Sequence, residues 1–315
     1  PLVHNSELSS KMTSELFQAS LFISLPNDSK TKLHLKRFYT NPQGAPIFLL
    51  HGAVENGRLF YSRSGKGLAP YLARLGYDVF VGDLRGKGES TPKIARHHQY
   101  GQTEAIREDI PAFIDEIVRL RGNIPQHWIA HSWGGVLLMS HLAYDDQRLP
   151  LIKSMVFFGT KRSIHSRNLK KFFTMDLVFG KLAPLLSFIY GYYPAKKINL
   201  GSDNETANFQ KGIRTWAQVK PWKDLDDQFD YAEAIKKLEL PPLLSFAAID
   251  DPFLGNPKDV EIFLKECGVK KVKHQVLSKK NGNLQDYNHV SMLTHPDSVK
   301  DHFSILIKFL ETVSR

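Results

Sequence analysis

The sequence of 315 residues contains a single cysteine, which excludes an intramolecular disulfide and any cysteine-rich zinc or iron–sulfur site. It also lacks an uninterrupted apolar run of the roughly 20 residues that a membrane-spanning helix needs. The most apolar stretch, residues 177–193, contains a lysine, a proline and two glycines. Charged residues make up only 23% of the chain and aromatic residues 11%, and this composition excludes intrinsic disorder.

Positive charge, by contrast, is in excess. The chain has 42 Lys and Arg against 32 Asp and Glu, a formal net charge of +10. Such a balance is typical of proteins that bind nucleic acid or an anionic membrane surface, and it also occurs where it serves only solubility. The first residue is Pro1 and not methionine, so the sequence leaves open both a cytoplasmic location and secretion after processing.

Short β-rich runs alternate with helical patterns along the chain, which predicts an α/β fold built on one sheet. Two opening strands are expected at residues 16–25 and 33–39, paired antiparallel. Continuous apolar runs, typical of strands buried on both faces, predict further strands at residues 46–50, 78–82, 127–130, 154–158, 243–248 and 274–277. Helices are expected at residues 68–74, 104–120, 135–143, 258–267 and 298–313.

One long interval, residues 161–237, interrupts this alternation because no strand pattern is clear in it. We interpret it as a largely helical cap inserted into a core formed by residues 1–160 and 238–315. Such a cap would cover the carboxyl edge of the sheet, where open α/β sheets bind their ligands.

The strongest chemical signal is Ser132, in the run Ala130-His131-Ser132-Trp133-Gly134. It lies directly after a predicted strand and directly before a predicted helix, where a sharp turn exposes the serine hydroxyl. This turn crowds the backbone, so small residues are needed two positions to either side. Gly134 meets that need, and Ala130 stands where glycine is usual. The alternative is a serine that only caps the helix.

Two further loops follow predicted strands. His51-Gly52-Ala53 ends the strand at 46–50, and the N–H of Ala53 is expected to point, with that of Trp133, at one oxyanion position. An ordinary strand-ending turn is the alternative. The loop at residues 83–90 lacks the Gly-x-Gly-x-x-Gly spacing of a phosphate-binding loop and opens no helix, so Asp83 and Arg85 are expected to brace neighbouring loops instead.

A serine nucleophile needs a base, and the base needs an orienting carboxylate. Asp250 and Asp251 follow the strand at 243–248, and His289 lies in the loop before the last helix. The order Ser, acid, His is the one that this kind of sheet uses. We choose Asp251 over Asp250 because Asp251 directly precedes a proline turn. Among thirteen histidines, His289 is the one with the right position, and the side chain of His131 is expected to turn away from the serine.

These residues together carry a family resemblance. His51-Gly52, Asp83-x-Arg85-Gly86-x-Gly88-x-Ser90, His131-Ser132-Trp133-Gly134-Gly135, Asp251 and His289 resemble the α/β-hydrolase superfamily. Within it, the chain is most similar to the serine-aminopeptidase-like branch, which includes monoacylglycerol lipases and lysophospholipases.

The resemblance implies a fold and a mechanism. The fold is an eight-stranded, mostly parallel sheet flanked by helices, and neither a metal nor an organic cofactor is implied. The mechanism is hydrolysis of an ester through an acyl-enzyme. The resemblance implies that Ser132 is the nucleophile, His289 the base and Asp251 the acid. It implies that the N–H groups of Ala53 and Trp133 bind the oxyanion. The residues with an implied supporting role are His51, Gly52, Gly134 and Asp250.

The substrate is suggested by where the charge lies. Residues 161–200 contain eight Lys or Arg, one acid and seven Phe or Tyr, so this segment alone has a charge of +7. Basic and apolar side chains together suit an acyl lipid with an anionic head, or peripheral contact with anionic lipid. A solvated lid over an apolar pocket is the alternative.

Other functions stay open at this point. A peptidase or amidase of the same branch would often present acids to the substrate amine, and residues 161–200 contain only one. A non-catalytic binding protein on a hydrolase scaffold usually lacks a member of the triad, and here all three types are present. Nucleic acid is not expected as a partner, because the basic residues gather in the cap.

Overall fold

The computed structural model describes residues 15–165 and 180–314. Eight strands form one sheet in the order β1-β2-β4-β3-β5-β6-β7-β8, and within it only β2 runs antiparallel to the others. This confirms the expected mostly parallel sheet with an antiparallel opening pair. The strands are β1 (Phe17–Leu25), β2 (Asp28–Tyr39), β3 (Pro46–Leu50), β4 (Asp78–Asp83), β5 (Gln126–His131), β6 (Ile152–Phe158), β7 (Leu243–Ala248) and β8 (Val272–Leu277).

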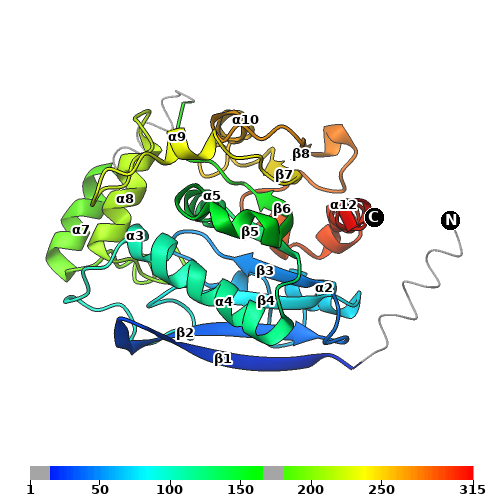
Figure 1. Cartoon of the computed structure of the whole chain (residues 1–315). Coiled ribbons are helices and arrows are strands. Elements are labelled where there is room, and N and C mark those ends of the chain that lie inside the picture. The colour runs from blue at the N-terminus through cyan, green and yellow to red at the C-terminus, as the bar shows by residue number, and fades with distance from the viewer. Residues whose placement is uncertain (1–14, 166–179, 315) are drawn as a thin grey trace, which may run out of the picture.

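Helices cover both faces of the sheet (Figure 1). One apolar cluster joins the sheet to α4, α5, α9 and α10, and a second joins its other face to α2, α11 and α12. The described helices are α2 (Leu68–Arg74), α3 (Gln102–Glu104), α4 (Ile110–Arg121), α5 (Trp133–Tyr144), α7 (Ala183–Tyr190), α8 (Ala207–Ala217), α9 (Tyr231–Ile235), α10 (Pro257–Glu266), α11 (Ser291–Thr294) and α12 (His302–Ser314).

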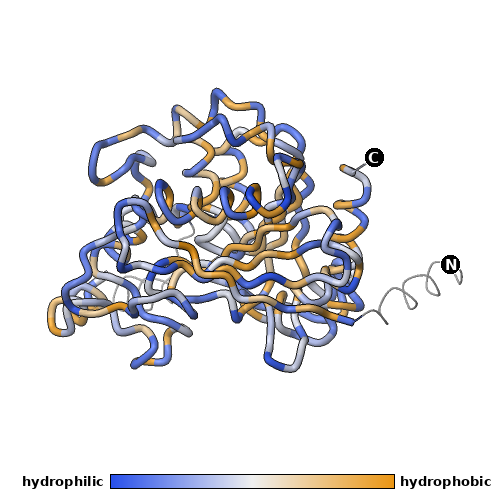
Figure 2. The backbone as a smooth tube through the Cα atoms, turned by 60° about the horizontal axis from the view of Figure 1, so that its bottom comes forward, coloured by the Kyte–Doolittle hydropathy of each residue, from blue (hydrophilic) through white to orange (hydrophobic). Residues whose placement is uncertain are grey.

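The central strands are buried along their whole length. Every residue of β3, β4, β5 and β7 is buried, as expected for parallel strands that helices cover on both faces. Figure 2 shows hydrophobic residues concentrated along these strands, with polar residues in the outer loops. This burial explains why continuous apolar runs predicted the strands, two of them with their observed bounds.

Two predicted helices differ from the structure near their first turns. The helix expected at 104–120 begins at Gln102 and contains a π-helical turn, Ala105–Asp109, before α4. At the end of this turn Asp109 is buried and accepts hydrogen bonds from the backbone N–H and Nε of Arg85, at 3.0 and 2.8 Å. The helix expected at 298–313 is divided into a 3₁₀ turn, Pro296–Val299, and α12.

The interval proposed as a cap holds α7, α8 and α9. Helices α7 and α8 lie against each other at one end of the molecule (Figure 1). Helix α9 packs instead on α5, and its Tyr231 and Ile235 belong to the main core cluster. The division of the chain at 161–237 remains a prediction. Four of the nine charged residues counted in its first part, Arg167, Lys170, Lys171 and Asp176, lie outside the described residues.

No helix in the described ranges is both long enough and apolar enough to cross a membrane.

Candidate active site

Ser132 occupies a strained turn between β5 and α5. Its backbone dihedrals are φ 53° and ψ −126°, a left-handed conformation that costs a non-glycine residue about 1–3 kcal/mol. Two contacts hold it there. The N–H of Ser132 donates to the carbonyl of Phe158 at 2.8 Å, and the hydroxyl of Thr160 donates to the carbonyl of Ser132 at 2.8 Å. The serine is therefore fixed at the carboxyl end of a central strand.

Glycines permit the close approach that this turn requires. A Cβ on Gly134 would lie 2.5 Å from the carbonyl oxygen of His51, and one on Gly52 would lie 2.9 Å from the Cβ of Ser132. Because the first obstacle is backbone, it cannot move aside. Ala130, at the position where glycine is usual, is fully buried, and the alanine fits there.

The structure brings His289 and Asp251 together. Nδ1 of His289 lies 2.5 Å from Oδ2 of Asp251, which is only 2% exposed. The other oxygen of this carboxylate accepts the N–H of Leu254 at 2.9 Å. Burial favours the neutral acid, but the contact with His289 outweighs it and lowers the pKa of Asp251. Asp250 is exposed, its N–H donates to the carbonyl of Tyr287, and the carboxylate on His289 is that of Asp251.

The contact with Asp251 selects one tautomer of His289. Because the carboxylate accepts a hydrogen bond from Nδ1–H, the lone pair of the neutral ring is on Nε2. Burial lowers the pKa of His289, and the neighbouring imidazole of His131 lowers it further, against the opposing effect of Asp251. Among the described residues the hydroxyl of Ser132 has no hydrogen-bond partner. Such contacts are often long in a free enzyme and tighten when substrate binds.

The two expected oxyanion donors lie on either side of the serine turn. Trp133 is the first residue of α5, and the first N–H groups of a helix have no partner within the helix. Ala53 follows Gly52 in the loop after β3. The next residue, Val54, has φ 54°, and the segment before α8 holds it there. A side-chain oxygen of Glu205 accepts the N–H of Val54 at 2.8 Å, and the N–H of Asp203 donates to the carbonyl of Val54 at 3.0 Å.

The remaining loop residues have bracing roles. Nε2 of His51 accepts the N–H of Leu84 at 3.2 Å, which ties the loop after β3 to the loop after β4. Asp83 accepts the N–H groups of Gly57 and Glu89 at 2.7 and 3.0 Å. The expectation that the 83–90 loop braces its neighbours is therefore confirmed.

Sequence reasoning missed two residues beside the serine. The side chain of His131 was expected to turn away from the site, and this prediction is wrong. Its ring centroid lies 4.5 Å from that of His289. Its Nδ1 lies 2.9 Å from Oε2 of Glu55, a residue that no pattern had singled out. A lone glutamate in a loop gives no signal in the sequence, since only the fold places it next to His131.

A second Ser-His-Asp array spans β1, β2 and the end of β4. Nδ1 of His34 is 2.7 Å from Oδ2 of Asp83, and its Nε2 is 3.0 Å from the hydroxyl of Ser20. Ser20 lies within the regular ladder between β1 and β2 and not on a strained turn. Hydrogen-bonded contacts alone therefore do not identify a nucleophile, because the exposed turn and the oxyanion donors are also needed.

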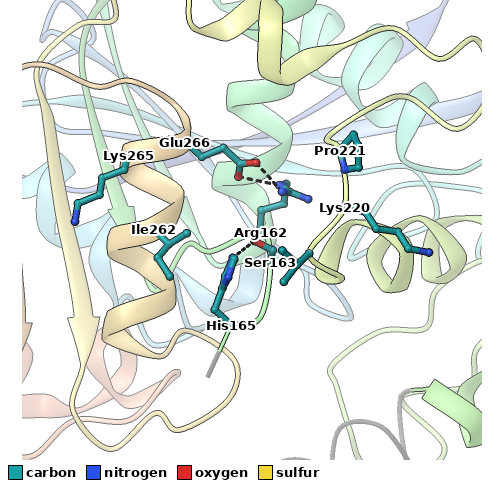
Figure 3. Close-up of a pocket in the computed structure, with 9 residues that line it drawn as sticks. Arg162, Ser163, His165, Lys220, Pro221, Ile262, Lys265 and Glu266 are labelled. Atoms are coloured by element: carbon teal, nitrogen blue, oxygen red, sulfur yellow. Dashed lines mark hydrogen bonds and ion pairs between the residues drawn. The ribbon is translucent and has the colours of Figure 1, made fainter. Parts of the chain in front are cut away.

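A hollow of about 590 Å³ lies elsewhere, between α10 and the segments around residues 162–165 and 219–221 (Figure 3). Its deepest cation, Arg162, is paired with both oxygens of Glu266 at 2.9 and 2.6 Å. None of the expected site residues lines it. Across residues 15–165 and 180–314, no group of three or more His, Cys, Asp or Glu side chains is arranged to hold a metal ion.

Comparison with known proteins agrees with this geometry. Residues 45–249 match the family model described as the alpha/beta hydrolase fold. Gastric triacylglycerol lipase of Mus musculus is 26% identical over 49% of this chain and 34% of its own length. The probable lysophospholipase L2 of Haemophilus influenzae is 30% identical over 36% of this chain and 35% of its own length. The matched regions thus span about a third of these two relatives.

Solved structures show the same fold at low identity. A carboxylesterase of the ammonia-oxidizing thaumarchaeon Nitrososphaera gargenis superposes with a TM-score of 0.62 at 14% identity, covering 93% of this chain and 99% of that one. A bromoperoxidase of Bacillus anthracis superposes with a TM-score of 0.60 at 14% identity, covering 93% and 100%. Since these neighbours differ in chemistry, they define the fold and not the reaction. The family match covers more than half of the chain, which therefore belongs to the alpha/beta hydrolase fold family.

Proposed function

We propose that this protein is a serine hydrolase of carboxylic esters, with Ser132 as nucleophile, His289 as base and Asp251 as the acid that orients the base. The observation that carries the proposal is the 2.5 Å contact between His289 and Asp251, in a chain whose Ser132 occupies a strained strand-to-helix turn. The lipases and lysophospholipase among its relatives support an ester as the substrate.

The proposed reaction begins with the neutral ring of His289. Its Nε2 takes the proton of Ser132 as the hydroxyl oxygen attacks the ester carbonyl. The resulting oxyanion accepts the N–H groups of Ala53 and Trp133, and losing one such donor typically slows a reaction about 10²–10³-fold. The protonated histidine then gives its proton to the leaving alcohol. Water, deprotonated by the same nitrogen, attacks the acyl carbon; the bond from this carbon to Ser132 then breaks, and His289 returns the proton to the serine oxygen as the acid is released.

The exposed face of α7 supports a lipid-like substrate. Leu185, Phe188 and Ile189 are 54, 84 and 52% exposed, and together they form an outward apolar stripe on this helix. On its inner side, Ala183 and Ser187 are buried. A helix that presents its large apolar residues outward is typical of a surface that meets lipid or another apolar partner.

Basic side chains flank α7 in the sequence. Lys181 and Lys196 are exposed, Nζ of Lys197 lies 4.7 Å from the ring centroid of Tyr190, and residues 180–202 contain no acid. Each Lys or Arg near an anionic bilayer contributes about 1 kcal/mol to binding. We therefore propose that α7 contacts the surface of an anionic membrane, which would bring lipid esters to the serine.

Covalent labelling tests the nucleophile. A fluorophosphonate probe should label the wild-type protein, and Ser132→Ala should abolish the labelling. Ser20→Ala, which alters the second Ser-His-Asp array, is the matched control and should be labelled like the wild type. Labelling that persists in Ser132→Ala would discard the assignment.

An ester series tests the substrate class. Hydrolysis of p-nitrophenyl esters from acetate to palmitate should favour the longer acyl chains, and vesicles that contain phosphatidylglycerol should raise the rate further. Phe188→Glu should weaken vesicle binding, whereas Phe22→Glu, at an exposed aromatic residue on β1, should not. A preference for acetate with no effect of vesicles would contradict the lipid proposal. Faster cleavage of matched anilides would favour an amidase.

A further inference from the structure

The ring of His131 lies between two hydrogen-bond acceptors. Its Nδ1 is 2.9 Å from Oε2 of Glu55, and its Nε2 is 2.8 Å from the backbone carbonyl oxygen of His289. A carbonyl oxygen only accepts, and a neutral imidazole carries a single N–H. If Glu55 is ionised, both nitrogens of His131 must therefore carry a proton, and the ring is a cation.

The surroundings of Glu55 favour its ionised form. The same oxygen that faces His131 also accepts the N–H of Gly52 at 2.9 Å, and two donors on one oxygen suit a carboxylate. Burial alone raises the pKa of Glu55, but the charge and the hydrogen bond of His131 outweigh it, and the pKa is lowered. Burial likewise disfavours the cation of His131, and Glu55 reverses this effect and raises its pKa.

We propose that Glu55 and His131 form a permanently charged pair that positions the base His289 and keeps it unprotonated. The pair joins three segments: Glu55 holds the Gly52 peptide next to the oxyanion loop, His131 adjoins the nucleophile, and its Nε2–H holds the backbone of His289. This role rests on the proposed function, in which His289 must be neutral to act. Glu55 and His131 are positioning residues, because neither is placed against the substrate.

The charges around the two rings determine the direction of the effect. The charges of Glu55 and Asp251 and the backbone carbonyl of His289 act on His131, and Asp251, His131 and Glu55 act on His289. The two ring centroids lie 4.5 Å apart, so a cation on His131 opposes a proton on His289. The negative charge of Asp251 favours protonation of His289. A proton on Nε2 of His289 would, however, place a second cation next to that of His131.

Glu55→Gln removes the charge but keeps a hydrogen bond to His131. With its amide nitrogen in place of Oε2, the glutamine donates to Nδ1 of a neutral His131, and the N–H of Gly52 loses its acceptor because a single oxygen contacts both groups. The bond from Nε2–H to the carbonyl of His289 is kept, and the two charges are lost together with the one contact to Gly52. Glu55→Ala removes the bridge as well, so the two variants distinguish electrostatic from purely structural effects.

Histidine NMR of the full chain is the primary test, and it needs no activity. With ¹⁵N-labelled histidine, one ring should keep both N–H protons up to pH 8.5. That signal should disappear in His131→Gln and should become a neutral ring in Glu55→Gln. His34 also contacts a carboxylate, but its second partner is a hydroxyl that can donate or accept, and His34→Asn identifies its signal. A neutral His131 at pH 8.5 in the wild type would overturn the proposal.

Kinetics then tests the effect on the base. In Glu55→Gln the acid limb of kcat/KM should move to higher pH by about one unit, since the nearer of the two lost charges is the cation. The maximal kcat should fall less than tenfold, whereas Glu55→Ala should lower it at every pH. An acid limb that stays in place or moves down in Glu55→Gln contradicts the proposed role. Absence of Ser132 labelling would instead reject the hydrolase function and leave the NMR result standing.

Discussion

The contact between Lys87 and Glu205 offers a sharp test of how the interval 161–237 is attached to the sheet. Nζ of Lys87 lies 2.6 Å from Oε1 of Glu205, and the two side chains are only 2 and 1% exposed. The same oxygen of Glu205 accepts the N–H of Val54 at 2.8 Å. One carboxylate therefore joins the segment before α8 to the loops after β3 and β4.

The perturbation is Glu205→Leu, which removes the carboxylate and roughly keeps its volume. Breaking a buried ion pair by removing one partner costs about 3–5 kcal/mol, because the other charge is left unpaired. The N–H of Val54 also loses its acceptor, which costs about 1–3 kcal/mol when the group stays buried. Lys87 keeps its bond to the carbonyl of Asn204, so we expect a net loss of about 4 kcal/mol.

Urea unfolding of the full chain measures this loss. The double variant Lys87→Met/Glu205→Leu should regain more than half of it, since no buried charge is then left without a partner. Glu233→Ala, which breaks an exposed ion pair with Lys236, is the matched control and should leave the midpoint unchanged. A loss below about 1 kcal/mol in Glu205→Leu, or a double variant as unstable as the single one, would refute the reasoning.

Three further predictions follow from the site. Asp251→Asn should lower kcat about 10⁴-fold, as for other orienting acids, and Asp250→Asn should leave it nearly unchanged, which ester hydrolysis will measure. The pKa of His289 is lowered and the base must be neutral, so kcat/KM should rise with pH through a midpoint below 6.5 and then stay level; a midpoint above 7 would contradict this. Gly134→Val should abolish folding because a backbone carbonyl lies 2.5 Å from its Cβ position, whereas Gly101→Ala, with 3.4 Å of clearance, should fold normally by circular dichroism.

Much of the core could be predicted because its signals are local. Strands β3 and β7 have the bounds that their apolar runs predicted, since a strand buried on both faces is a nearly continuous apolar run, which in β7 only Ser245 interrupts. Ser132 could be found for a similar reason, because a strand, a sharp turn and a helix follow one another within a few residues. His289 and Asp251 needed the order of the motifs along the chain as well.

The structure alone decided the contacts between distant segments. It selected Asp251 over Asp250 as the partner of His289, because the turn after β7 buries one carboxylate and exposes the other. The π-helical turn before α4 was equally hidden, since it depends on a buried contact with a loop after β4. The proline after Asp251 had already favoured this residue over Asp250 in the sequence, whereas no local pattern had predicted the π-helical turn.

The charged residues also show which properties follow from the sequence and which follow from the fold. The sequence by itself determined that the positive charge is concentrated between residues 161 and 200, and that the chain builds an α/β sheet with a serine at a strand's end. Only the tertiary structure decided which of the other charges are paired and buried, as in Lys87 with Glu205 and Arg85 with Asp109. The physical reason is that burial stabilises a charge only where the fold brings a partner within hydrogen-bonding distance, and that partner can lie anywhere in the chain.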